Sequence, residues 1–150
     1  MHKPATPRFQ IRKIAVLLAI ATTIPVVAAP AGPAQAATSK RVVKKAHNAT
    51  LGKTILVNLR GLTLYSLSAE THGKFICKRG CLVDWHPLYV AKGVKPTGAA
   101  KLGTVKRPDN GRRQVTFKGR PLYTFDEDAK PGDAKGEGIK DVGTWRAATP

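Results

Sequence analysis

The chain of 150 residues is strongly basic, with 26 lysine and arginine residues, nine acidic residues and a formal net charge of +17. Its 11 prolines and 14 glycines, and the lack of any long 3.6-residue apolar period, exclude a helical bundle. Composition therefore favours a small β-rich domain whose charge attracts polyanions.

The first 36 residues have the three parts of a secretory signal peptide. Four basic residues and no acidic residue accompany an apolar run over residues 14–29, and Ala34-Gln35-Ala36 provides a cleavage site. The run is interrupted by Pro25 and is shorter than the roughly 20 residues that a membrane-spanning helix needs. We therefore expect Sec-dependent export, cleavage after Ala36 and a secreted protein without a transmembrane anchor.

The mature chain is expected to begin with a basic, flexible lead-in over residues 37–50, which has little apolar pattern. Its clustered cations are Lys40, Arg41, Lys44 and Lys45. Residues 37–108 carry 14 basic residues against two acidic ones, and the rest of the chain is nearly neutral. These cations either keep the protein soluble or, as we predict, bind anionic polymers of the cell envelope.

From residue 51 onward, turn signals separate short extended segments. Residues 54–57 and 62–67 flank an Arg-Gly turn, and residues 104–106 and 114–117 flank an Asn-Gly pair, the strongest short hairpin signal. A further extended segment covers residues 121–125. The pattern predicts a mostly β single domain over residues 51–150.

Two parts of this domain repeat each other at an offset of 58 residues. The matched pairs are Tyr65 with Tyr123, Leu67 with Phe125 and Glu70 with Asp128, and the copies lead to Trp85 and Trp145 respectively. Internal repeats usually bury one another's apolar faces. We therefore predict two tandem hairpin-containing repeats, over about residues 51–90 and 102–150.

The repeat resembles a bacterial secreted-repeat family, also described as predicted lipoproteins with a Yx(F/W/Y)xxD motif. The resemblance is carried by Leu64-Tyr65-Ser66-Leu67, by Cys77-x-x-x-Cys81-x-x-x-Trp85-His86-Pro87-Leu88 and by Leu122-Tyr123-Thr124-Phe125-Asp126-Glu127-Asp128. The first copy departs from the motif at Leu67 and Glu70, and no lipobox cysteine is present. The resemblance implies an extracytoplasmic module of unknown function, here in a released form.

The motif allows two interpretations. On a strand, Tyr123 and Phe125 point to one face, and Asp128 falls just beyond the strand, where a carboxylate can accept N–H bonds of a turn. The rings then fill the core and the acids hold the turns. Alternatively, the rings and carboxylates form a surface that binds a sugar or peptide.

Cys77 and Cys81 predict a disulfide, because two cysteines in an exported protein meet an oxidising compartment. An alternative is that the C-x₃-C pair holds copper or zinc together with His72 or His86. The chain would then be an extracytoplasmic metal or redox accessory protein.

No catalytic motif emerges from the sequence. None of the three serines of the mature chain has the glycine pattern of a nucleophile elbow. We therefore expect a non-enzymatic module of the cell envelope that has no cofactor, and no nucleic-acid partner outside the cell.

Overall fold

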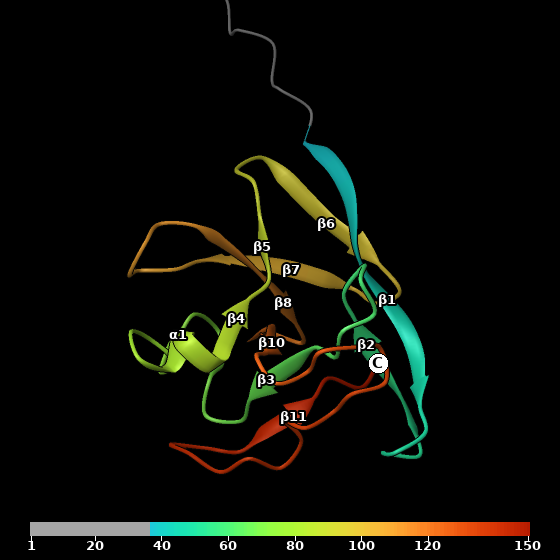
Figure 1. Cartoon of the computed structure of the whole chain (residues 1–150). Coiled ribbons are helices and arrows are strands. Elements are labelled where there is room, and N and C mark those ends of the chain that lie inside the picture. Colours follow the sequence, from blue (N-terminus) through green and yellow to red (C-terminus); the bar gives the residue numbers. More distant parts are fainter. Residues whose placement is uncertain (1–36) are drawn as a thin grey trace, which may run out of the picture. The chain divides into compact units, whose positions relative to one another are not determined.

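The computed structural model describes residues 37–150, which form three small β-sheets (Figure 1). The strands are β1 (Thr38–Asn48), β2 (Lys53–Val57), β3 (Tyr65–Leu67), β4 (Trp85–Pro87), β5 (Tyr89–Val90), β6 (Val94–Gly98), β7 (Leu102–Lys106), β8 (Arg113–Phe117), β9 (Arg120–Pro121), β10 (Tyr123–Phe125) and β11 (Trp145–Ala147). One short helix, α1 (Cys81–Asp84), precedes β4. The predicted mostly β class is confirmed.

The predicted signal peptide, residues 1–36, lies outside the described residues. Between residues 37 and 150, no helix is long and apolar enough to cross a membrane.

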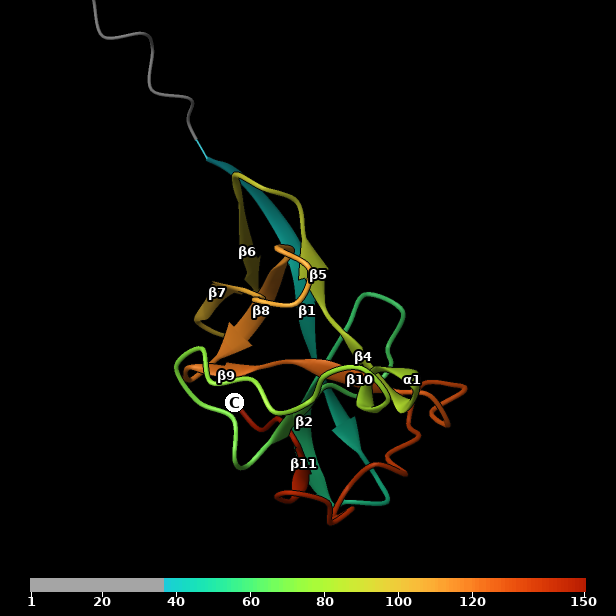
Figure 2. The same cartoon turned by 90° about the vertical axis from the view of Figure 1, so that its left-hand side faces the viewer.

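The segment expected to be a flexible lead-in is instead the longest strand. The first half of β1 pairs in parallel with β6, and its second half pairs antiparallel with β2 (Figure 2). Val42 and Val43 are buried at the middle of the strand, where the register shifts at a β-bulge. The prediction of flexibility was wrong because β6, which lies about 55 residues further along the chain, pairs with the first half of this segment and satisfies its backbone.

The Asn-Gly pair forms the predicted hairpin between β7 and β8. The two strands pair antiparallel from Leu102↔Phe117 to Lys106↔Arg113. The N–H of Arg107 donates to the carbonyl of Arg112 at 2.9 Å, and Gly111 adopts a left-handed conformation with φ +69°. β5 and β9 extend this sheet by pairing with β8.

The two motif strands pair with each other at the centre of the third sheet, whose order is β11-β3-β10-β4. Tyr65 lies opposite Tyr123. The outer strands are exchanged: the β11 strand that follows the second motif pairs with β3, and the β4 strand that follows the first motif pairs with β10. Each copy of the motif therefore completes the sheet of the other.

Aromatic rings of both copies fill the core beside this sheet. Trp85 and Trp145 stack with centroids 3.6 Å apart and planes 7° apart. Tyr65 meets Trp85 edge-on at 5.4 Å, and Tyr123 meets Trp145 edge-on at 5.2 Å. Both tyrosines are 0% exposed, so their rings belong to the core and form no surface for a sugar or peptide.

Candidate functional site

The two motif acids bind the tyrosines of the opposite motif copy. The hydroxyl of Tyr65 donates to Asp128 Oδ2 at 2.7 Å, and the hydroxyl of Tyr123 donates to Glu70 Oε2 at 2.8 Å. The second oxygen of each acid accepts backbone N–H groups, which belong to residues 76 and 77 for Glu70 and to residue 135 for Asp128. All four side chains are buried, so these carboxylates hold turns and link the copies.

A buried arginine that the sequence analysis did not single out completes the network. Arg107 is 0% exposed, and its guanidinium donates to Asp109, Gln114, Tyr123 and the carbonyl of Cys77. Burial alone would lower the pKa of Arg107, but the hydrogen bonds to Asp109 and Tyr123 and their charges raise it above its ordinary value. The same hydrogen bond holds the pKa of Asp109 below its ordinary value.

The buried phenols keep their protons. Burial is the largest cause that raises the pKa of Tyr65, and Asp128 adds to it. Burial, followed by the charge of Glu70, likewise raises the pKa of Tyr123, although Arg107 opposes the shift. Neither tyrosine is suited to general-base chemistry at neutral pH, since each donates its proton to a carboxylate.

These raised pKa values predict a steep loss of stability in alkali. Above about pH 10, the unfolded chain releases its phenolic protons, whereas Tyr65 and Tyr123 keep theirs in the folded state. The folded state then binds two more protons, so the free energy of unfolding falls by roughly 2.7 kcal/mol per pH unit. Urea unfolding followed at several alkaline pH values measures this slope. The matched variant Tyr65→Phe should show about half of it, and an unchanged slope in that variant would contradict the assignment.

The candidate metal ligands are not brought together. Cys77 and Cys81 form a disulfide with Cα atoms 5.2 Å apart. His86 Nε2 lies 3.1 Å from Asp126 Oδ1 on the surface, and His72 lies in another loop, where its backbone N–H donates to the carbonyl of Gly119. In the part of the chain that the structure describes, no group of three or more His, Cys, Asp or Glu residues could hold a metal ion.

A depression of about 720 Å³ lies between the β7–β8 hairpin, β5, β6 and the first half of β1. We call it the basic cleft. Its cations are Lys40, Lys92, Lys106, Arg112 and Arg113, and the other lining residues are Val42, Tyr89, Val90, Ala91, Val94 and Gly111. None of the described residues that line it is acidic. With five positive side chains around one apolar floor, the cleft focuses a positive field.

Local contacts hold the tyrosine and the arginines of the cleft in place. The Arg112 guanidinium lies 3.6 Å from the centroid of the Tyr89 ring, a cation–π contact. Asn110 donates to the Tyr89 hydroxyl at 2.9 Å, and Arg113 donates to Thr104 at 3.2 Å. The hairpin turn and β5 are thereby joined at the rim of the cleft.

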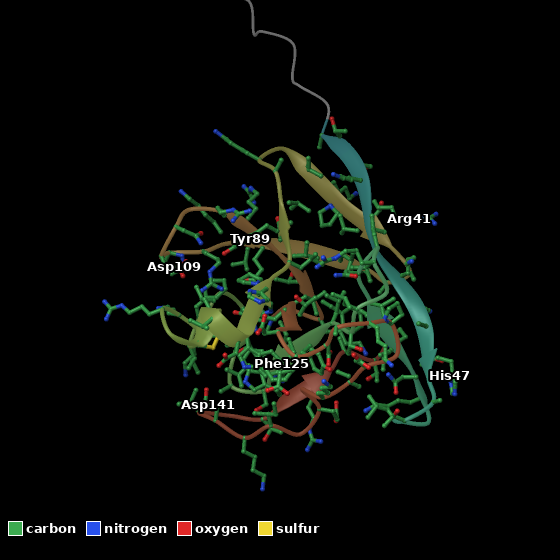
Figure 3. The ribbon with its side chains drawn as sticks, in the orientation of Figure 1. Arg41, His47, Tyr89, Asp109, Phe125 and Asp141 are labelled. Carbon is green, nitrogen blue, oxygen red and sulfur yellow. A yellow bond between two sulfur atoms is a disulfide. The ribbon has the colours of Figure 1, made fainter. Side chains whose placement is uncertain are left out.

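The four cations predicted to bind polymers are divided between two surfaces. Lys40 lines the basic cleft. Arg41, Lys44 and Lys45 line a second depression of about 280 Å³, together with Val43, Gly98 and Ala99. Figure 3 shows the Arg41 side chain pointing away from the side of β1 on which Tyr89 lies.

Sequence reasoning missed Lys92, Lys106, Arg112 and Arg113 as members of one site. The fourteen basic residues between residues 37 and 108 predicted a positive surface. The Asn-Gly pair predicted the hairpin that carries Arg112 and Arg113. Neither signal says that the hairpin faces β1 and β5.

Comparison with known proteins gives one match. Residues 103–149 match a family described as a secreted repeat of unknown function, which confirms the resemblance for the segment that contains the second motif copy and Trp145. The family description supports an extracytoplasmic location. Neither a curated protein nor a solved structure matches the chain.

Proposed function

We propose that this protein is a secreted, non-enzymatic module that holds linear anionic polymers of the cell envelope in the basic cleft. The observation that carries the proposal is the convergence of five cations on one cleft whose described lining contains no acid. In this proposal, the two repeats (about residues 51–90 and 102–150) form the scaffold, and residues 1–36 direct export and are then removed.

The cations of the cleft are free to meet a ligand. Four cations of the cleft lie outside β1 and are exposed, namely Lys92, Lys106, Arg112 and Arg113. None of them has an acidic partner among the described ion pairs. A polymer with regularly spaced phosphates or carboxylates would contact several of them at once and release its own counterions, which is the main source of affinity in polyanion binding. Such contacts read charge density more than sugar or backbone identity.

The remaining chemistry supports binding over catalysis. Both buried motif carboxylates already accept protein hydrogen bonds, and both buried tyrosines donate to them. Arg107, the one buried cation among the described residues of the core, is paired with Asp109 at 2.8 Å. These buried polar groups are therefore committed to structure, whereas the cations of the cleft have no acidic partner among the described ion pairs.

Neutralising part of the cleft tests this function. The triple variant Lys92→Gln, Lys106→Gln, Arg112→Gln should bind linear polyphosphate at least about tenfold more weakly at low salt, since each cation near a polyanion contributes about 1 kcal/mol. The dependence of log Kd on log salt should also become shallower by roughly two for three lost contacts. Fluorescence anisotropy of labelled polyphosphate at several salt concentrations gives both quantities.

A matched control removes the same charge from another surface. Lys74, Lys78 and Lys140 are exposed and line neither depression. Their triple replacement by glutamine should change affinity much less than the cleft variant does. Equal losses in the two variants would show that net charge alone, and not the cleft, determines binding.

A further inference from the structure

Strand β1 separates two basic surfaces. Lys40 and Val42 line the basic cleft, whereas Arg41, Val43, Lys44 and Lys45 line the second depression. Lys40 and Arg41 point to different sides of β1, as successive residues of a strand do. The β-bulge between Arg41 and Val43 interrupts this alternation, and Lys44 and Lys45 both line the second depression. Because Arg41 points away from the side of β1 on which Tyr89 lies (Figure 3), the two depressions lie on opposite sides of β1.

The second depression has the same chemical character as the cleft. Its three cations, Arg41, Lys44 and Lys45, are exposed, and none of the described residues that line it is acidic. Val43, which is 1% exposed, anchors its floor in the core. On β6, a side chain in place of Gly98 would clash with the backbone carbonyl of Val43, so glycine keeps the two strands close and the depression open.

We propose that the second depression is an independent polyanion site, so that one protein molecule bridges two anionic polymer chains. The inference rests on the proposed function, because the first polymer occupies the basic cleft. Hydrogen-bonded backbone of β1 and β6 lies between the two sites, and a stiff polyanion in one site cannot enter the other without folding around β1. Because the two basic depressions lie on opposite sides of β1, they favour the binding of two separate polymer chains over the binding of one.

A capture experiment with two labels on the same polymer tests bridging. Biotin-labelled linear polyphosphate is immobilised and loaded with the mature protein, the surface is washed, and fluorophore-labelled polyphosphate is then added. We expect the protein to retain the second polymer in proportion to the protein bound. The same experiment with biotin-labelled and fluorophore-labelled polyglutamate tests whether the two sites also bind carboxylate polymers.

Three variants separate the two sites. The triple variant Arg41→Gln, Lys44→Gln, Lys45→Gln should still load on the surface through the basic cleft but retain about tenfold less of the second polymer. The cleft variant (Lys92→Gln, Lys106→Gln, Arg112→Gln) should load on the surface through the second depression. It should also retain about tenfold less of the second polymer. The control variant of Lys74, Lys78 and Lys140 should bridge like the parent.

The outcomes distinguish this inference from the proposed function. A parent protein that loads on the first polymer but retains no second polymer overturns bridging and leaves the cleft proposal standing. Failure to load on any polymer overturns both. If the Arg41, Lys44 and Lys45 variant bridges like the parent, bridging comes from self-association of the protein through its clefts, and the second site is disproved.

Discussion

Replacing Tyr123 by alanine is expected to lower the free energy of unfolding by about 3–5 kcal/mol, the usual cost of truncating a buried aromatic side chain. Tyr123 is 0% exposed, and its ring meets Trp145 edge-on. Its hydroxyl donates to Glu70 and accepts from Arg107. The substitution thus creates a cavity and removes one hydrogen-bond partner from each of two buried charged groups, Glu70 and Arg107. Urea unfolding of the mature protein, with the disulfide intact, measures the change.

The variant Tyr123→Phe separates the ring from the hydroxyl. Because it keeps the ring and removes only the hydrogen bonds, it should cost about 1–3 kcal/mol. Tyr89→Ala is a matched control, since Tyr89 is only partly buried and lies at the cleft; it should affect polyanion binding more than stability. If Tyr123→Ala unfolds at the same urea concentration as the parent, the motif tyrosines do not hold the core.

Replacing Arg107 by alanine should destabilise the protein by about 3–5 kcal/mol, because it removes a large buried side chain and the hydrogen bonds that this side chain donates to the buried Gln114 amide oxygen and the Cys77 carbonyl. The Arg107 side chain also donates to Asp109 in the β7–β8 turn and to Gln114 on β8. Its loss therefore also loosens the part of the hairpin that lines the basic cleft. Denaturant unfolding and polyphosphate affinity should both be measured.

Lysine cannot substitute for this arginine. A guanidinium donates in several fixed directions, here to Asp109, Gln114, Tyr123 and the carbonyl of Cys77, whereas an ammonium group is a compact charge on a flexible stem. Arg107→Lys should recover only a minor part of the lost stability. Arg112→Ala, which removes an exposed arginine from the same turn, should leave the unfolding midpoint nearly unchanged. Full rescue by lysine would contradict the network.

Local signals in the sequence were enough to find some elements and insufficient for others. The Asn-Gly turn places the β7–β8 hairpin because a two-strand unit needs no distant partner. The motif strands were also predictable, since Tyr65 and Tyr123 alternate with residues of the opposite face. β1 was not, because its exposed cations mask two buried valines and its parallel partner β6 lies far along the chain.

The buried arginine and the division of the basic residues depend on tertiary contacts. Nothing near Arg107 in the sequence distinguishes it from Lys106, which is exposed beside it. The difference arises because Glu70, Cys77 and Tyr123 gather around one side of the hairpin, a consequence of pairing between the motif copies. In the same way, Lys40 and Arg41 are neighbours in sequence, and only the pairing of β1 with β6 assigns them to different depressions.

The proposed function depends most on where a polyanion binds, and an NMR titration of the isotope-labelled mature protein with short linear polyphosphate measures this directly. We predict saturable shift changes concentrated at the amides of Tyr89–Lys92 and of Lys106–Arg113, with a smaller set along β1, and changes that weaken as salt is raised. The core amides around Trp85 and Trp145 should be unaffected. Shifts scattered in proportion to surface lysines, or centred on the α1 loop and the His86–Asp126 pair, would contradict the assignment of the basic cleft as the binding site.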